Sequence, residues 1–212
     1  MYKMASSEVV SFKKLKMNDV LLESPQKNIR FYYSQIKHKN NPLLIQSPLF
    51  KDIHSLSSSE IMFGLDDNDD MYKFLYDFDH HCSKVLIDNS KEWFGKKLSE
   101  KQIETMYRSS IYIDASNSAF FTLNIDKNCD IYDENNNVID VSKIDKSSTK
   151  HGYVLLFQPL FLKVLKTSTN VVWVLRQMKI FSVKTIAADP LPKKLLINEN
   201  EPKEEEDEKS FY

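Results

Sequence analysis

The sequence predicts an α+β protein that is mainly β, with a curved sheet or small barrel and a helical insertion at about residues 69–107. Three observations predict this class. Short runs rich in β-branched and aromatic residues occupy the first third of the chain. From Asp69 onward, apolar residues recur at spacings of three and four, the period of an amphipathic helix. After Ser109 the strand pattern returns and continues to Lys184.

The first third is expected to hold about three strands. Weak alternation of apolar and polar residues predicts a short strand between Val9 and Leu15. The segment Ile29–Ser47 is predicted to be a hairpin, because "NIRFYYSQI" and "PLLIQSP" favour strands and "KHKNN" supplies turn residues between them. The run "EIMFGL" predicts a further short strand after a serine-rich loop.

A long amphipathic helix is predicted from Asp69 to about Gly95. Its apolar stripe consists of Met71, Phe74, Leu75, Phe78, Cys82, Val85 and Leu86. The acidic run "DDNDD" complements the positive end of the helix dipole, and Gly95 can end the helix in a left-handed conformation. Ser99 and Gln102 have the spacing of a capping box, which predicts a second, shorter helix through about Tyr107.

The remaining strands are expected after the helices. The predicted strands are "SIYID", "AFFTLNI", "NVIDV", "GYVLLFQPLFLKVLK" and "NVVWVLRQMKIFSVK", separated by loops such as "DKNCD", "DENNN" and "KTSTN". Two long strands around a short loop indicate a strongly curved sheet with the helices on one side or end.

The chain is long enough for one substantial core, since 42% of its 212 residues are hydrophobic. We expect a single globular domain over residues 1–188 and a disordered acidic tail over residues 189–212. The overall net charge of −1 hides an uneven distribution. From Glu199 onward, seven acidic residues oppose two lysines, a net charge of −5, so residues 1–198 carry +4.

Cysteine use and hydropathy indicate a protein of a reducing, intracellular compartment. Cys82 and Cys129 are the two cysteines and lie far apart in the sequence, which argues against a disulfide framework. The first residues have no apolar stretch of the signal-peptide type. The most apolar segment, "YVLLFQPLFLKVL", falls short of the roughly 20 residues that a membrane-spanning helix needs.

Several catalytic motifs are excluded by composition. The three glycines, Gly64, Gly95 and Gly152, cannot assemble a Walker loop, a dinucleotide fingerprint or a nucleophile elbow. The acidic run at 66–77 lacks the glycine that a calcium loop needs at its sixth position. In "DFDHHC", Asp77 and His81 share a helix face, but the other histidines and the second cysteine are scattered singly. We therefore expect no enzyme, no cofactor and no metal, with a metal-dependent nucleic-acid enzyme centred on "DFDHHC" as a third alternative.

Cationic and aromatic side chains occur together on the predicted strands. In "RFYY", Arg30 and Tyr32 lie on one face and Phe31 and Tyr33 on the other. Such mixtures suit single-stranded nucleic acid, because bases stack on rings while cations follow the phosphates. Aromatic residues on strands more often belong to a core, and scattered lysines more often solvate a surface. The candidate nucleic-acid-binding residues are Arg30, Tyr32, Tyr33, Lys37, Lys39, Lys96, Lys97, Lys163, Trp173, Arg176 and Lys179, and Lys166 would extend the same track.

The acidic tail ends in two aromatic residues. An acidic segment needs no aromatic residue to stay soluble, so this ending indicates an anchor for a partner's pocket. The tail could also occupy a basic groove of its own chain until nucleic acid displaces it. The candidate partner-binding residues of the tail are Glu204, Glu205, Glu206, Asp207, Glu208, Phe211 and Tyr212.

Two resemblances bear on function. The tail resembles those of bacterial and podophage single-stranded-DNA-binding proteins, which have an acidic run ending in an aromatic residue. The runs "NPLLIQSPLF", "VLIDNSKEWFGKKLSE" and "VVWVLRQMKIF" resemble a small uncharacterised protein family of nucleocytoplasmic large DNA viruses, the mimivirus and phycodnavirus relatives. This match covers roughly Ile29 to Lys184, and "NSKEWFGKK" is its most specific part. The chain is more loosely similar to viral single-stranded-DNA-binding proteins with an OB-like barrel, which implies an OB-like fold here.

Besides the metal-dependent enzyme named above, these observations lead to one functional hypothesis and one main alternative. The hypothesis is a non-enzymatic, non-sequence-specific single-stranded-DNA-binding protein for viral replication or recombination, with RNA as a second possible ligand. Its tail would recruit viral replication proteins, and the protein would act in the host cytoplasm or viral factory, or travel in the virion. Oligomeric state stays open. The alternative is a structural or interaction protein of the virion or replication complex that binds no nucleic acid itself.

Overall fold

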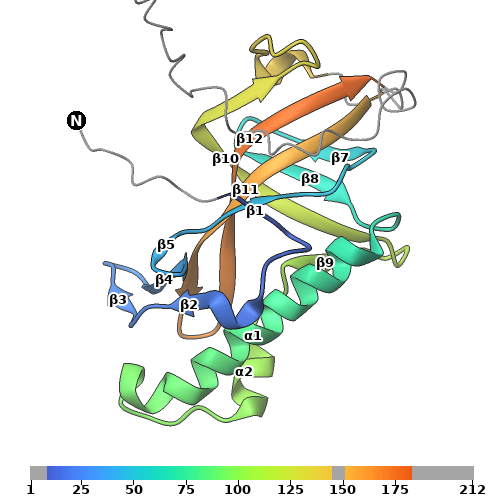
Figure 1. The fold of residues 1–212 in the computed structure, drawn as a ribbon. Coiled ribbons are helices and arrows are strands. Elements are labelled where there is room, and N and C mark those ends of the chain that lie inside the picture. The colour runs from blue at the N-terminus through green and yellow to red at the C-terminus, as the bar shows by residue number, and fades with distance from the viewer. Residues whose placement is uncertain (1–8, 145–150, 183–212) are drawn as a thin grey trace, which may run out of the picture.

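The computed structural model describes residues 9–144 and 151–182 of the chain (Figure 1). The predicted class is confirmed: the protein is mainly β, with a curved mixed sheet and a helical insertion between two groups of strands. Figure 1 shows the long strands curving through the upper part of the molecule, with the two helices below them.

Eight strands precede the helices in the described residues, more than the three or so that the sequence predicted. They are β1 (Val9–Ser11), β2 (Val20–Leu22), β3 (Gln26–Lys27), β4 (Tyr32–His38), β5 (Asn41–Pro42), β6 (Leu44–Gln46), β7 (Ile53–Leu56) and β8 (Glu60–Gly64), with a 3-10 helix η1 (Met17–Asp19) before β2. Most have two to four residues, too few for a periodic pattern to stand out.

The predicted hairpin over Ile29–Ser47 forms in part. Strands β4 and β5 pair across a two-residue turn at Lys39 and Asn40, both with positive φ (49° and 71°), as predicted for "KHKNN". Strand β6 instead pairs with β1 and β11.

The helical insertion and the strands after it follow the predicted order. These elements are α1 (Asp69–Phe94), α2 (Glu100–Met106), β9 (Ile111–Ile113), β10 (Ala119–Tyr132), a 3-10 helix η2 (Val141–Lys143), β11 (His151–Val164) and β12 (Thr169–Ser182). The neighbouring strands run in the order β1-β6-β11-β12-β10-β8-β7, with β4 pairing to the end of β11 beyond β6. Within the described residues, this strand path is open and ends at β1 and β7.

Two segments differ from the prediction between β9 and β11. The expected loop "DKNCD" lies inside β10, where a register shift against β12 between Ile125 and Asp130 accommodates its polar residues as a bulge. The expected strand "NVIDV" is wrong: Val138 makes an isolated bridge to Tyr132, and η2 follows. The carboxylate of Asp140 accepts a hydrogen bond from the Ser142 amide (2.8 Å), and such local bonds favour a turn over an extended backbone.

Helix α1 packs on the sheet around Trp173. This side chain is 3% exposed, and its ring lies 4.9 Å from the Phe78 ring of α1. The rings of Phe121 and Phe157 lie 5.5 and 5.6 Å from the Trp173 ring, which joins α1, β10, β11 and β12 in one aromatic cluster. The core of the protein is therefore centred where the helix crosses the long strands.

A buried carboxylate ties the helix to the segment before β9. Asp79 of α1 is 7% exposed and accepts hydrogen bonds from the Tyr107 hydroxyl (3.0 Å), the Ser109 hydroxyl (3.1 Å), and the amide and hydroxyl of Ser110 (2.6 and 2.7 Å). The Trp173 Nε1–H donates to the same Ser110 hydroxyl oxygen (2.6 Å). Burial raises the pKa of Asp79, while the hydrogen bonds from Ser110, Tyr107 and Ser109 partly oppose the rise.

The helix ends are the local features that the sequence predicted best. Gly95 follows α1 with φ of +71°, a left-handed conformation that favours glycine. Ser99 and Gln102 form both bonds of the predicted capping box at α2. In the connection between the two helices, the Leu98 amide donates a hydrogen bond to the buried hydroxyl oxygen of Ser90 in α1 (2.9 Å). This bond ties the connection to α1.

No helix among the described residues has the length and apolar character needed to cross a membrane. The predicted acidic tail and its boundary at residue 188 lie outside the described residues.

The raised pKa of Asp79 predicts a specific pH dependence of stability. The folded protein keeps the Asp79 proton to higher pH than the unfolded chain does, so this group's contribution to the free energy of unfolding should fall as pH rises from about the ordinary value of 3.8 through the folded pKa. Urea titrations at several pH values measure this for the wild type and for Asp79→Asn, which cannot titrate. The stability of the wild type relative to the variant should decrease with rising pH and then level off. A difference independent of pH would contradict the assignment.

Candidate functional site

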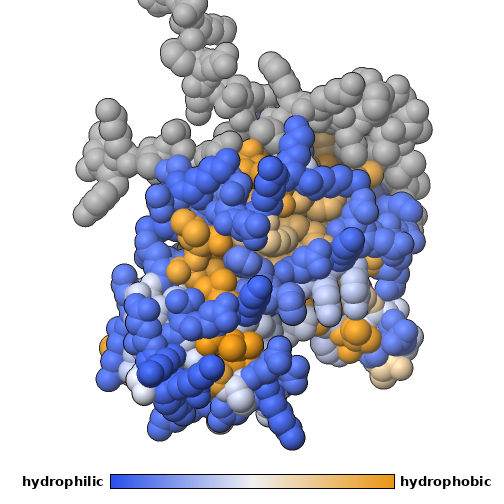
Figure 2. Space-filling view, turned by 60° about the horizontal axis from the view of Figure 1, so that its bottom comes forward, coloured by the Kyte–Doolittle hydropathy of each residue, from blue (hydrophilic) through white to orange (hydrophobic). Residues whose placement is uncertain are grey.

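A cleft of about 1010 Å³ lies beside the far ends of the long strands, at the helical end of the molecule. Three segments distant in sequence form its walls: the β3–β4 connection with the start of β4, the end of α1 with α2, and the turn between β11 and β12. Figure 2 brings this end of the molecule forward and shows apolar patches in orange among hydrophilic side chains in blue.

Four aromatic side chains line the cleft: Phe31 just before β4, Tyr32 at the start of β4, and Trp93 and Phe94 at the end of α1. The Phe31 ring stacks on the Phe161 ring of β11, with centroids 6.1 Å apart and planes at 19°. On the other side of the strand, the Tyr32 ring meets the Phe94 ring edge to face at 6.0 Å, and Phe94 meets Trp93 at 6.4 Å. Since Tyr32 is 39% exposed, this aromatic wall has ring surface open to a ligand.

The cleft is basic. Its lining includes the cations Lys27, Arg30, Lys96, Lys101 and Lys166, and no Asp or Glu is among the lining residues. All five are exposed, and none forms an ion pair with a carboxylate of the described residues. Cations of like sign gathered in a hollow produce a positive potential that attracts anions.

The structure brings several of the predicted residues to this cleft. Arg30, Tyr32 and Lys96 line it, and Lys97 is exposed beside Lys96 in the connection between the helices. Lys163 of β11 is not among the lining residues, but its Nζ lies 5.1 Å from the centroid of the Phe31 ring. Tyr33 packs against Phe161 (5.7 Å), on the same side of the strand as Phe31. Phe31 and Tyr33 therefore share one side, and Tyr32 meets Phe94 on the other.

Other predicted residues lie elsewhere and have partners. Lys37 is ion-paired with Glu23, and the Nζ of Lys39 lies 3.8 Å from the Asp19 carboxylate. Lys37 lies near the end of β4 opposite the cleft, and Lys39 lies just beyond that end. On β12, the ammonium of Lys179 donates a hydrogen bond to Asn136 and lies 5.7 Å from the Phe181 ring centroid.

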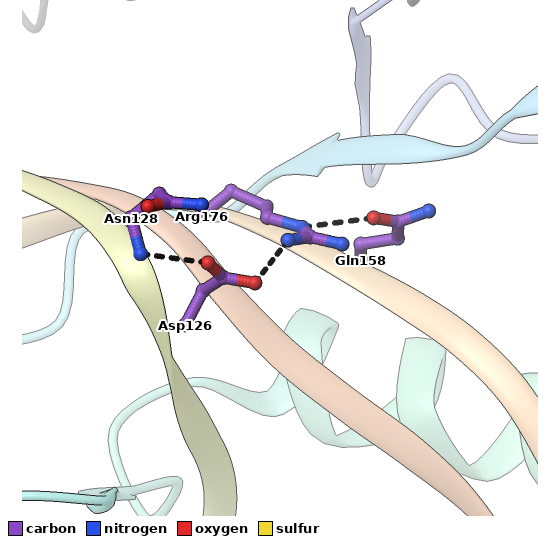
Figure 3. Close-up of polar contacts among 4 residues, drawn as sticks. All are labelled: Asp126, Asn128, Gln158 and Arg176. Carbon is purple, nitrogen blue, oxygen red and sulfur yellow. Dashed lines mark hydrogen bonds and ion pairs between the residues drawn. The ribbon is translucent and has the colours of Figure 1, made fainter.

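The Arg176 side chain is engaged in contacts within the protein (Figure 3). Its guanidinium forms an ion pair with Asp126 in the bulge of β10, and its Nε donates to the Gln158 side-chain oxygen on β11 (2.9 Å). Asp126 also accepts a hydrogen bond from the Asn128 amide (2.8 Å). Arg176 thus connects three neighbouring strands where β10 is irregular.

The Trp173 side chain is buried in the core and does not reach the surface. Strict alternation along β12 would place Trp173 with Gln177 and Lys179 on one face, but the pairing with β11 shifts register at Arg176. Because the shift changes which positions face the core, Met178 joins Trp173 there. Because its side chain is 3% exposed and packs among Phe78, Phe121 and Phe157, Trp173 cannot stack on a ligand's base, and its inclusion among the binding residues is corrected.

Sequence reasoning missed part of the cleft. Lys27 and Lys101 were not singled out, because a lone lysine beside a turn or on a short helix carries no pattern. Phe94 and Trp93 were visible as consecutive aromatics after an apolar helix face, and the structure shows them half-buried at the edge of the core as well as lining the cleft.

The cluster "DFDHHC" does not form a metal site among the described residues. Asp79 is engaged in the buried network, and the His81 Nε2 lies 3.0 Å from the Val20 carbonyl oxygen. Burial raises the pKa of the Cys82 thiol well above its ordinary range and that of Cys129 to about 12. Both thiols are therefore poor nucleophiles at neutral pH.

The fold and the cleft define a mainly β protein with an aromatic, carboxylate-free basic cleft. The chain belongs to the family of unknown function DUF5871, whose family model matches residues 51–197. No curated protein matches the sequence.

Solved structures show distant likenesses. The single-stranded DNA binding protein gp2.5 encoded by bacteriophage T7 has 10% sequence identity and a TM-score of 0.43, over 71% of this chain and 98% of that one. The single-stranded DNA-binding protein from bacteriophage Enc34 in complex with ssDNA has 10% identity and a TM-score of 0.36, over 76% of this chain and 94% of that one.

The environment of Arg176 predicts a stability effect. Arg176→Met removes the ion pair to Asp126 and the bond to Gln158, and should lower the free energy of unfolding by about 1–2 kcal/mol because both contacts are partly screened by solvent. Urea denaturation measures the effect. The exposed neighbour Lys127 serves as control, since Lys127→Met should change stability by less than about 0.5 kcal/mol. Equal stabilities of the two variants would show that the Arg176 contacts contribute nothing.

Proposed function

We propose that this protein binds single-stranded DNA in the basic aromatic cleft, without sequence preference and without catalysis. The observation that carries the proposal is the combination, in one cleft, of five cations without carboxylate partners in the described residues and four aromatic side chains. Phosphates of a nucleic-acid strand match the cations, and its bases match the rings.

The arrangement favours a single strand over a duplex. Base faces in a duplex are covered by their neighbours, whereas an unpaired strand can turn them toward Tyr32 and Phe94. Each base stacked on an aromatic side chain contributes about 1–3 kcal/mol, and stacking depends little on which base is present. RNA offers the same phosphates and base faces. The ratio of the protein's affinities for RNA and DNA therefore reports any contact to the 2′-hydroxyl.

The acidic tail gives the proposal a regulatory part. Residues 199–212 carry a net charge of −5 and match the charge of the cleft, so the tail competes with nucleic acid for the same cations. When nucleic acid displaces the tail, Phe211 and Tyr212 at its end become available to other proteins. We propose that these partners are replication proteins of a large DNA virus. Action in the host cytoplasm or viral factory belongs to the same proposal.

One observation favours the alternative, an interaction protein without nucleic-acid binding of its own. Strand β9 is a short strand with Tyr112 and Ile113 exposed at 55% and 50%, and Tyr76 of α1 is also exposed. Exposed apolar side chains near a strand edge suit a protein partner.

Binding through phosphate contacts predicts a defined salt dependence. Affinity for an oligothymidine, measured by fluorescence anisotropy at several salt concentrations, should fall with a log–log slope of about −3.5 if all five cations contact phosphates. The triple variant Arg30→Gln, Lys96→Gln and Lys101→Gln should reduce the magnitude of that slope by about 2 and weaken binding at low salt at least tenfold.

A matched control removes the same charge elsewhere. The triple variant Lys14→Gln, Lys84→Gln and Lys127→Gln changes three exposed lysines outside the cleft and should leave the slope nearly unchanged. If both triple variants weaken binding equally, the cleft is not the binding site. If the wild type fails to bind at low salt, both with and without its tail, the proposed function is wrong.

Competition by the tail predicts that a chain ending at Asn198 binds oligothymidine more tightly than the full chain. The gain should be about three- to tenfold at low salt and should shrink as salt screens the tail. Replacing Phe211 and Tyr212 by Ala in the full chain keeps the charge and should leave most of the competition in place, while pull-down experiments report lost partners. Equal affinities of the full and shortened chains would contradict tail competition.

A further inference from the structure

The loop between β3 and β4 ends in an apolar side chain that contacts almost nothing. Strand pairs Gln26–Tyr33 and Lys27–Tyr32 close the hairpin, and Ile29 at its tip is 95% exposed. A single exposed isoleucine is ordinary on protein surfaces, so exposure alone assigns no role. The position of Ile29 at the tip of a hairpin that lines the cleft is more informative.

The hairpin is held firmly on both sides of this tip. The Asn28 amide donates to the Phe31 carbonyl oxygen (2.7 Å), and the Ile29 amide donates to the Asn28 side-chain oxygen (2.6 Å). At the base, the Tyr33 hydroxyl donates to the Gln26 side chain (2.7 Å), and Phe31 stacks on Phe161. These contacts hold the backbone of the loop that carries Ile29.

Charges flank the apolar tip on both sides. Lys27 and Arg30 are exposed, line the same cleft, and have no ion-pair partner in the described part of the chain. An apolar side chain between two cations suits a base step of a nucleic acid. The side chain can contact the bases while the cations contact the phosphates on either side. Proteins that unstack a base step insert such a side chain as a wedge.

We propose that Ile29 is a wedge that packs against the terminal base pair where a single strand leaves a duplex, so that the cleft binds junctions in preference to uninterrupted single strands. This inference rests on the proposed function, since the single strand beyond the junction lies in the cleft. An uninterrupted flexible strand already exposes its base faces and gains little from a wedge. The terminal pair of a duplex has one stacked face without a neighbour, which an isoleucine side chain can cover.

The test compares two DNAs that share one single strand. The first is an oligothymidine of about 15 nucleotides, within the site sizes of single-strand-binding domains, and the second carries the same strand as an overhang on a short duplex, in each polarity. Dissociation constants come from fluorescence anisotropy, and 2-aminopurine at the terminal pair reports its stacking. The wild type should bind one overhang DNA at least fivefold more tightly than the single strand, with a change in 2-aminopurine fluorescence.

Variants at the tip separate the wedge from general binding. Ile29→Ser should abolish the junction preference and the fluorescence change, so that the overhang DNA and the single strand bind with equal affinity, and Ile29→Met should retain both. The control Val138→Ser removes another exposed apolar side chain (72% exposed) outside the cleft and should have no effect.

Each contrary outcome has a distinct meaning. A wild type without junction preference, or an Ile29→Ser variant that retains it, overturns the wedge while single-strand binding still supports the proposed function. An equal loss on both DNAs makes Ile29 an ordinary strand contact and also overturns the wedge. Failure of the wild type to bind either DNA, with or without its tail, instead overturns the proposed function itself.

Discussion

The packing of helix α1 on the sheet through Trp173 is the constraint on which the rest of the structure depends. The indole ring contacts Phe78 of the helix and Phe121 and Phe157 of the strands, and its Nε1–H reaches Asp79 through the hydroxyl of Ser110. Apolar contact area and a satisfied buried carboxylate thus hold one helix in one position. Because the helix is 26 residues long, fixing its middle also fixes where Trp93 and Phe94 stand at its end, opposite the start of β4. The cleft is a consequence of that placement.

The cleft gathers five cations in one hollow with no Asp or Glu among its lining residues. Lys13, Lys51 and Arg176 each have a carboxylate partner, which offsets their local field. The cations of the cleft have none among the described residues, and the lining supplies no acid. A nearly neutral chain can therefore carry a local cluster of positive charge, which its net charge of −1 does not reveal. The acidic residues from Glu199 onward have the opposite charge to this hollow, which supports the proposed competition between the tail and nucleic acid.

Local interactions made the helical part predictable from the sequence, whereas the cleft required long-range contacts. The period of α1, the left-handed Gly95 and the capping box of Ser99 and Gln102 all depend on neighbours within four residues, and all are present. Alternation along β12 failed at Arg176, since a bulge depends on the partner strand and has no marker in its own sequence. Arg30, Tyr32 and Lys96 were found as parts of local patterns, but only the fold brings them to Lys101 and Lys166.

The most direct test of the account locates the nucleic acid on the protein. Ultraviolet cross-linking of an oligothymidine that carries bromodeoxyuridine, followed by mass spectrometry of the peptides, identifies the rings that lie against bases. The account predicts cross-links in the peptides that contain Phe31 and Tyr32 and in those that contain Trp93 and Phe94. Cross-links confined to the β10–β12 surface around Arg176 and Lys179 would contradict it.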